Sequence, residues 1–416
     1  MTNTTFADVC LLKLVLIIKL ANLGQMPESH HFKLNPDEQA IIESLQAAIL
    51  KLLANPDGKI TFHDFMQTVL YTPGLGYYMN NKLKLGKEGD FTTAPEMSSL
   101  FGQCIASQTF KVLQTLEKPN IIEFGAGSGK LACDILQSLA ERQMLPMNYY
   151  IVELSGHLKQ LQYATIKAHC PEHLNRVHWV SELTDIDQAM VIANEVLDAM
   201  PIHLVNISPT DAKEYYVTYA DNQWQFQLGN LSNRRLGSAI DNLRKSNDYF
   251  TTHYYHATEI NLYIEPWLRN IATVLEKACI LILDYGFPRR EYYHPDRDQG
   301  TLMCHYRHRC HPNPLRLFGV QDITAHVDFT AVAEAADTNQ LTVQGFTTLG
   351  YFLLSSGLHQ KINPMTVNVE DWQNKQAIMQ LTSPNEMGEL FKVMQLTKNL
   401  DLKLSGYTLK DMIYRL

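Results

Sequence analysis

The sequence predicts an α/β protein with a doubly wound, mostly parallel sheet, preceded by a helical region. Three observations support this fold class. Short apolar runs alternate with amphipathic stretches through the middle of the chain, as strands alternate with helices in a parallel sheet. A glycine-rich loop joins the first of these runs to the helix after it. Polar residues follow several of the runs, at the carboxyl ends of strands where such sheets bind ligands.

The composition is that of an ordinary globular protein. The chain has 416 residues, of which 45% are hydrophobic and 19% are charged, so it can bury a substantial core. The net charge of −8 argues against nucleic acid as a partner, because phosphate backbones require a basic surface. The seven cysteines are scattered and odd in number, which favours a reduced compartment over a disulfide framework.

The first 25 residues are predicted to be an extension outside the fold. Residues 9–23 are mostly apolar, but Lys13 and Lys19 interrupt the run, which is shorter than the ~20 residues needed to span a bilayer. The segment lacks a basic start and a small-residue cleavage site, so it is a poor secretory signal, and it contains no arginine, which weakens a transit-peptide interpretation. We expect a misassigned start before Met26, with a weakly membrane-associated helix as the alternative.

Helices dominate the predicted N-terminal region, residues 26–116. Apolar residues recur at helical spacing in three stretches, at 37–54, 61–71 and 98–116. Asn35 is placed to cap the first helix, and Pro36 to be its first residue. A loop punctuated by glycines separates the second helix from the third.

The region 117–416 is predicted to hold the sheet. Its five parallel strands are expected at residues 121–124, 149–152, 177–180, 190–193 and 280–283. Helices are expected between them at 131–140, 157–168 and 259–276. Two further strands, at 341–346 and 391–396, would complete the sheet, although the second pattern also fits a helix.

An insertion at about 202–258 separates the fourth strand from the fifth. It contains a predicted hairpin, in which residues 214–219 and 223–228 flank Asp221 and Asn222. We expect the insertion to contact either the substrate or a second copy of the chain in a homodimer.

The strongest local motif is Gly125-Ala126-Gly127-Ser128-Gly129, which follows a strand and begins a helix. Glycines there permit positive φ and close approach of a ligand, and the helix start offers unpaired N–H groups. A dinucleotide-binding loop is disfavoured, because Lys130 stands where its third glycine belongs, and the Gly-Lys-Ser/Thr ending of a phosphate-binding loop is missing. With Glu123 just before it, the loop suits a methionine-plus-nucleoside ligand without phosphate, although a purely structural turn is the alternative.

Polar residues at three strand ends extend this interpretation. Glu153 lies 26 residues after the middle glycine, where an acid can accept hydrogen bonds from both ribose hydroxyls. Ser181 and Glu182 follow the third strand, near the expected adenine edge, but they fit a turn cap equally well. Glu195 ends the fourth strand together with Asn194, and a helical turn would place Asp198 on the same face as Glu195.

These residues, with several further segments, resemble the methyltransferase family of the mitochondrial respiratory complex I assembly factor and its bacterial relatives. The resemblance runs in order through about residues 35–400. It rests on residues 89–96, 125–129, 151–155, 193–201, 284–286, 300–302 with Tyr306 and His308, and 322–329.

The resemblance implies a class I methyltransferase fold, which is Rossmann-like, with S-adenosylmethionine as cofactor. For the mitochondrial member it implies symmetric dimethylation of a protein arginine, so the expected partner is a protein substrate that carries an arginine, such as a respiratory-complex subunit. Without a transit peptide, the chain is expected to be bacterial and cytoplasmic, with the mitochondrial matrix as the alternative for a eukaryotic protein. Membrane contact is not expected.

Within this framework, Glu195 and Asp198 are the expected catalytic residues, because a carboxylate pair can hold and orient a guanidinium. The alternative is that Glu195 contacts only the cofactor or caps a helix. The loop at 89–96 is expected to cover the cofactor. The expected cofactor-binding residues are Glu123, Gly125, Gly127, Gly129, Glu153, Asn194, Asp90 and Thr92.

Tyr306 and His308 are expected on the substrate side, together with the block 322–328 that contains His326, although Asp328 within it is expected to cap the helix that follows. Residues 304–311 contain two cysteines and three histidines, but their spacing and the interleaved arginines argue against zinc, so no metal is predicted. A non-catalytic assembly factor or chaperone on the same scaffold is the main alternative function. A nicotinamide-dependent oxidoreductase is disfavoured by Lys130, and nucleic-acid methylation by the net charge of −8.

Overall fold

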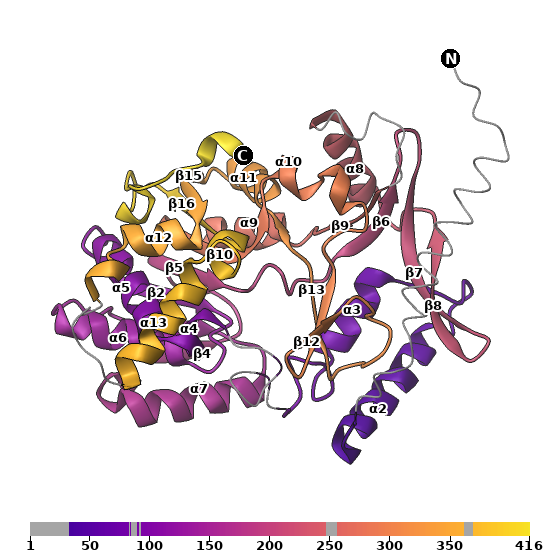
Figure 1. Ribbon diagram of the computed structural model, residues 1–416, viewed down its shortest axis with the longest axis horizontal. Coiled ribbons are helices and arrows are strands. Elements are labelled where there is room, and N and C mark those ends of the chain that lie inside the picture. The colour runs from indigo at the N-terminus through magenta and orange to yellow at the C-terminus, as the bar shows by residue number, and fades with distance from the viewer. Residues whose placement is uncertain (1–32, 83, 85–89, 91–92, 247–255, 362–368) are drawn as a thin grey trace.

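The computed structural model describes residues 33–82, 84, 90, 93–246, 256–361 and 369–416 (Figure 1). The predicted extension over residues 1–25 lies outside these ranges. An eight-stranded sheet and a five-stranded sheet form the two main parts of the molecule, and a third sheet has three strands. Within the described ranges, no helix is both long enough and apolar enough to cross a membrane.

The eight-stranded sheet confirms the predicted α/β fold. In spatial order its strands are β15 (Thr342–Thr348), β16 (Phe391–Lys398), β10 (Lys277–Phe287), β5 (Gln188–Asn194), β2 (Asn120–Phe124), β3 (Tyr149–Val152) and β4 (Val177–Val180), and β14 (Val327–Asp328) pairs with β10. The five strands from β10 to β4 run parallel, and β16 is antiparallel to both of its neighbours. All seven predicted strands of the sheet are confirmed, although β10 continues four residues past its predicted end.

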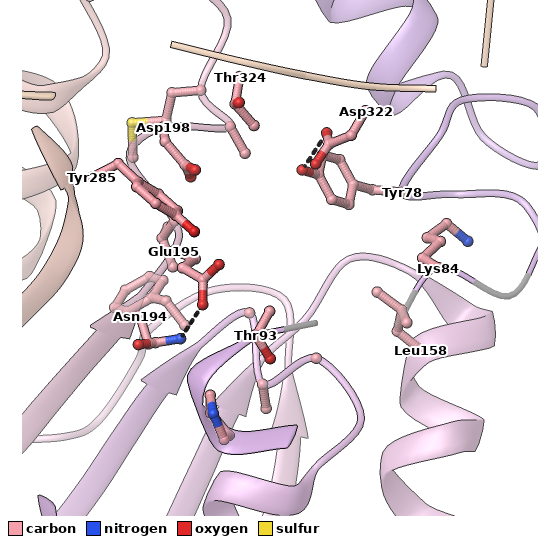
Figure 2. A pocket seen from close by; sticks show the side chains of 18 of the residues that line it. Tyr78, Lys84, Thr93, Leu158, Asn194, Glu195, Asp198, Tyr285, Asp322 and Thr324 are labelled. Atoms are coloured by element: carbon pink, nitrogen blue, oxygen red, sulfur yellow. Dashed lines mark hydrogen bonds between the residues drawn. The ribbon is translucent and has the colours of Figure 1, made fainter. Parts of the chain in front are cut away.

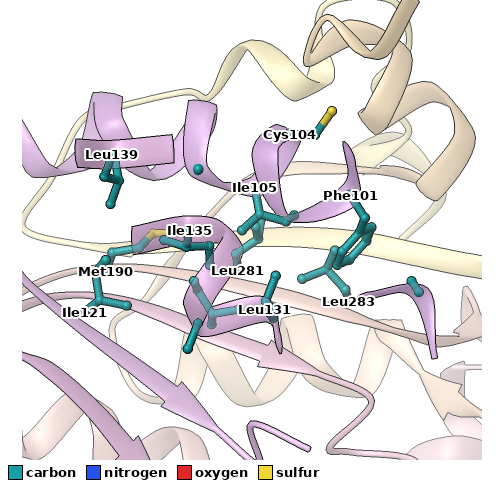
Figure 3. Close-up of a cluster of buried hydrophobic side chains, with 14 of the residues drawn as sticks. Phe101, Cys104, Ile105, Ile121, Leu131, Ile135, Leu139, Met190, Leu281 and Leu283 are labelled. Atoms are coloured by element: carbon teal, nitrogen blue, oxygen red, sulfur yellow. The ribbon is translucent and has the colours of Figure 1, made fainter. Parts of the chain in front are cut away.

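Alternate residues of each parallel strand face opposite sides of the sheet, so the sheet has a core on both faces. The covering helices are α5 (Ser99–Leu113), α6 (Lys130–Glu141), α7 (Gly156–His169), α9 (Ile264–Val274) and α11 (Phe329–Thr338). Ile121 and Leu281 pack on the side of α5 and α6 (Figure 3). Their chain neighbours Ile122 and Ile282 pack on the side of α9 and α11. Burial on both faces explains why these strands are almost uniformly apolar.

The predicted start of the first helix is confirmed in detail. α2 (Pro36–Leu52) follows Asn35, whose side chain accepts a hydrogen bond from the Glu38 N–H at 2.8 Å. The Glu38 carboxylate accepts in return from the Asn35 N–H at 3.0 Å, which completes a capping box. The second helix, α3 (Phe62–Tyr71), begins after Thr61, and a short helix, α4 (Ala94–Met97), precedes α5.

The insertion forms most of the five-stranded sheet. Its elements are β6 (His203–Ile207), β7 (Ala212–Ala220), β8 (Gln223–Gly229), α8 (Arg234–Ser246) and β9 (His256–Ile260). β7 and β8 confirm the predicted hairpin, and Asp221 and Asn222 both have the positive φ of a tight hairpin turn. β1 (Ile60–Thr61) joins the same sheet by pairing with β7. The insertion therefore shares a core with α3, in which Phe65 packs with Tyr215.

One predicted helix boundary is wrong. The helix expected at 259–276 begins only at Ile264, because residues up to Ile260 pair with β6 as part of β9. The ambiguous segment at 391–396 is the strand β16, since it is hydrogen-bonded between β10 and β15. The remaining elements are α10 (Arg289–Tyr292), β11 (Met303–Tyr306), β12 (Arg309–His311), β13 (Asp322–Thr324), α12 (Leu349–Ser355), α13 (Val369–Thr382), α14 (Met387–Leu390), and short 3-10 helices at 171–176, 295–297, 358–361, 405–407 and 413–415.

Candidate active site

A cavity of about 570 Å³ lies at the carboxyl ends of the parallel strands, where doubly wound sheets bind ligands. One side consists of the segments that follow β2, β3 and β5, together with Tyr285 of β10. The other side consists of Tyr71, Tyr78 and Lys84 from the N-terminal region and of residues from β11 and β13. The central sheet and the N-terminal region therefore build this cavity together.

The glycine loop lines the cavity through Gly125 and Gly127, whose φ angles are 61° and 52°. Gly129 differs from the prediction, because it does not line the cavity. It is the N-cap of α6 with a φ of 88°, and a Cβ there would lie 3.1 Å from Cα of Gln162. Its small size therefore allows α6 and α7 to pack closely, and the Gln162 amide donates to the Gly127 carbonyl at 3.1 Å.

Two acids flank the glycine loop on the cavity wall. Glu153 accepts hydrogen bonds from the Ser155 N–H at 2.8 Å and from the Gln162 amide at 3.0 Å, one on each carboxylate oxygen. Because each oxygen has a second lone pair, the carboxylate can still accept from two ribose hydroxyls. Glu123 accepts from the Tyr149 hydroxyl at 2.7 Å, and burial raises its pKa to about 7. A positively charged, hydroxyl-rich ligand such as S-adenosylmethionine fits this donor and acceptor set.

Glu195 and Asp198 both lie on the cavity wall (Figure 2). The prediction that a helical turn would bring these two residues together is wrong, because the segment after β5 is a turn and not a helix. Asp284 of β10 holds this turn: one carboxylate oxygen accepts from the N–H groups of Val196, Leu197 and Asp198, the shortest at 2.8 Å. Glu195 has a φ of 54°, a conformation that non-glycine residues seldom adopt. Such strain is typical of functional sites.

The carboxyl groups of this wall prefer to hold protons in the absence of a cation. Burial, followed by the nearby Asp284, raises the pKa of Glu195 to about 8. The same two causes, in the same order, raise the pKa of Asp198. Burial raises the pKa of Asp322 to about 7 on the opposite side of the cavity. A cationic ligand would therefore release protons from the cavity as it binds.

The stability of the ligand-free protein should report the raised pKa of Glu195. A carboxyl whose pKa is higher in the folded state stabilises the fold below its unfolded pKa of about 4.5 and loses that contribution as pH rises through 8. Relative to wild type, the free energy of unfolding of the Glu195→Gln variant should therefore rise as pH increases from 5 to 8.5, by on the order of 1–2 kcal/mol. Urea unfolding across this range measures the gain, with the exposed Glu276→Gln change as control. A gain that shrinks as pH rises would contradict the assignment.

Asn194 lines the cavity, and its amide donates to the Glu195 carboxylate at 3.2 Å. His326 also lines the cavity, as predicted for the substrate side. Its ring stacks on Phe287 with centroids 5.5 Å apart, and its backbone N–H donates to the Thr301 hydroxyl at 2.9 Å. Burial lowers the pKa of His326 to about 4, so the imidazole is neutral at neutral pH.

Besides Gly129, three predicted site residues lie outside the cavity wall. The Asp90 carboxylate is buried outside the cavity wall, where it accepts from the Tyr77 hydroxyl, the Lys82 ammonium and the Arg307 N–H. Tyr306 also lies outside the wall, because successive residues of a strand face opposite sides and His305 takes the cavity side. The Tyr306 hydroxyl donates to Glu38 at 3.0 Å instead. His308 does not line the cavity, and its backbone N–H donates to the Asp90 carbonyl at 2.9 Å.

Two further predictions concern the edges of the site. Thr92 lies outside the described residues. Asp328 is confirmed as the N-cap of α11, since its carboxylate accepts from the N–H groups of Thr330 and Ala331, and it also pairs with Arg289 at 3.1 Å. Among the described residues, no group of histidine, cysteine and acidic side chains is arranged to hold a metal ion.

Several cavity residues were missed by reasoning from the sequence. Asp322, Thr324 and His326 are not among them, because they belong to the segment 322–328 that was expected on the substrate side, and they alternate along one strand and its extension. Tyr71, Tyr78 and Lys84 gave no comparable signal, because they reach the cavity only through the packing of the N-terminal region on the central sheet.

The parallel sheet, the glycine loop and the acidic strand ends together define a class I methyltransferase that uses S-adenosylmethionine. A family model described as "Putative S-adenosyl-L-methionine-dependent methyltransferase" matches residues 104–347. The chain belongs to this family.

Similar proteins agree with this placement. A crystal structure from Burkholderia thailandensis, bound to S-adenosyl-homocysteine, is 34% identical, covers 93% of this chain and 100% of its own, and has a TM-score of 0.86. The mitochondrial protein named protein arginine methyltransferase NDUFAF7 homolog in Drosophila melanogaster is 26% identical over 91% of both chains. Human protein arginine methyltransferase NDUFAF7 is 24% identical, over 89% of this chain and 87% of its own.

Proposed function

We propose that this methyltransferase methylates an arginine side chain of another protein. The observation that carries the proposal is the pair of carboxyl groups, Glu195 and Asp198, which Asp284 holds on one wall of the cavity. The names of the Drosophila and human relatives support the same class of acceptor.

The two carboxylates address the main difficulty of the reaction, which is that a guanidinium is a poor nucleophile while its charge is delocalised. Glu195 and Asp198 would accept hydrogen bonds from the guanidinium and draw its positive charge away from the attacking nitrogen. S-adenosylmethionine, when bound, supplies a methyl group on a positively charged sulfur. The carboxylates also align the attacking nitrogen with that methyl group, and alignment of this kind contributes several kcal/mol.

Each transfer forms a nitrogen–carbon bond, breaks the carbon–sulfur bond with its electron pair left on sulfur, and releases one proton from the acceptor nitrogen. We assign the proton to Glu195, because its carboxyl group lies on the cavity wall where the acceptor would bind and its burial favours the protonated form. We place His326 beside the acceptor as a neutral ring, because its stacking on Phe287 fixes its orientation.

We assign cofactor binding to the half of the cavity that lies against the glycine loop. Gly125 and Gly127 let the ligand approach the backbone, Glu153 binds the ribose, and Glu123 and Asn194 complete the wall. Within the described ranges, the insertion contributes no residue to the cavity wall. We propose that the insertion supports α3, with which it shares a core, and that it contacts the acceptor protein.

Labelled methyl transfer tests the proposal. Purified protein and S-adenosylmethionine with a tritiated methyl group are incubated with a lysate of the source organism that lacks this gene, and the labelled proteins are hydrolysed to amino acids. The label is expected in methylated arginine, and it should be absent when Glu195→Gln protein is used. Label in lysine or in small molecules would identify another acceptor. Cofactor binding with no transfer would favour a non-catalytic assembly factor.

A further inference from the structure

Asp322 is an acidic residue that faces the cavity from the side opposite Glu195 and Asp198 (Figure 2). It is only 2% exposed. It begins β13, which pairs with β11, and Thr324 of the same strand lines the cavity two residues further on. Its position is therefore set by a strand, and the side chain is withdrawn from bulk solvent.

The Asp322 carboxylate is oriented by two hydrogen bonds to one of its oxygens. Oδ1 accepts from the Tyr78 hydroxyl at 2.7 Å and from the Ile323 N–H at 2.9 Å. Within the described part of the chain, Oδ2 accepts no hydrogen bond. Lys84 lines the same cavity, but its ammonium donates to the carbonyls of Asn80 and Lys82 at 2.7 and 2.8 Å. One oxygen of Asp322 is thus left available to a ligand.

The two acidic walls are connected through the backbone. The Ala325 N–H, next to His326, donates to the Asp198 carbonyl at 3.0 Å. This hydrogen bond ties the segment that carries Asp322 to the turn that carries Glu195 and Asp198. The backbone segments that carry the three carboxyl groups are therefore linked directly, which favours a preorganised binding site.

We propose that Asp322, oriented by Tyr78, is the substrate-binding residue that selects a guanidinium over other acceptors; this inference rests on the proposed arginine methylation. A guanidinium is planar and carries five N–H donors, so it can meet Glu195 and Asp198 on one side and Asp322 on the other. A neutral acceptor carries no charge that would stabilise Asp322 as a carboxylate, so it would form no ion pair with this residue. Asp322 would therefore act on acceptor recognition and leave cofactor affinity unchanged.

The test uses two synthetic probes, so that it does not depend on knowing the acceptor protein. Each probe is an adenosine linked through its 5′ position to a short chain, ending in a guanidinium in the first and in a neutral urea in the second. Calorimetry gives the affinity of each probe for wild type, Asp322→Asn, Tyr78→Phe and the surface control Asp296→Asn. The ratio of the two affinities isolates recognition of the guanidinium.

We expect wild type and Asp296→Asn to prefer the guanidinium probe at least 50-fold. Asp322→Asn should reduce this preference at least tenfold while binding the urea probe as wild type does. Tyr78→Phe should reduce the preference less, about two- to fivefold, because the Asp322 carboxylate remains but loses one orienting hydrogen bond. This variant keeps Asp322 itself, so it still tests the proposal if the Asp322→Asn variant folds poorly.

An unchanged preference in both variants would overturn the role of Asp322 and leave arginine methylation intact. A wild type that binds both probes equally would overturn the guanidinium site itself, and with it the proposed acceptor. The methylarginine measurement in lysate then separates these cases, because loss of the Asp322 role alone leaves methylarginine among the products.

Discussion

Calorimetry of the Gly127→Val and Glu153→Ala variants is expected to show S-adenosylmethionine binding at least 100-fold weaker than that of wild type. Gly127 has a φ of 52° and lines the cavity, so a β-branched side chain would strain the loop and occupy ligand space. Glu153 is held by Ser155 and Gln162 with lone pairs still available for both ribose hydroxyls. Its removal would leave those hydroxyls without acceptors in a buried site.

Two matched changes control for loss of folding. Gly237→Val alters a glycine of α8 whose Cβ position is open, with Leu231 at 3.8 Å as its nearest neighbour. Glu276→Ala removes an exposed glutamate. Both controls should bind the cofactor as wild type does. Undiminished binding by the Gly127 and Glu153 variants would show that the cofactor lies outside this cavity.

The Glu195→Gln variant is expected to lose about 10²- to 10⁴-fold in turnover, as the removal of a transition-state contact or a general base does. Its affinity for S-adenosylmethionine should stay within about threefold of wild type, because the amide has the same shape. Glutamine can still accept one hydrogen bond from a guanidinium, but it carries no negative charge and cannot take up the released proton.

Initial rates of methylarginine formation and calorimetric cofactor affinity, measured on the same preparations, separate the possible roles of Glu195. Equal losses in rate and affinity would mean that Glu195 serves cofactor binding. A loss in rate alone would support contact with the acceptor. The Asp284→Asn variant offers a comparison, since it weakens the hydrogen bonds that hold the turn and should lower the turnover without removing either wall carboxyl.

Much of the fold could be predicted because its signals are local. The capping box of α2 lies within four residues, and the hairpin turn at Asp221 and Asn222 lies within two. The parallel strands are short apolar runs because they are buried on both faces, which leaves a pattern that can be read without knowing the partners. The predicted start of the helix at 259–276 was wrong because Glu259 and Ile260 pair with β6, some 55 residues earlier in the chain.

The sequence by itself determined the fold class, the glycine loop and the acids at the ends of β2, β3 and β5, because backbone conformation and strand alternation depend on neighbouring residues. Only the tertiary structure decided which side chains reach the cavity. Asp284 forms the Glu195–Asp198 turn from a strand 86 residues away, strand alternation turns His305 inward and Tyr306 outward, and Tyr78 meets Asp322 across 244 residues. Contacts at such separations depend on how whole layers pack, and a packing arrangement leaves no periodic trace in the sequence.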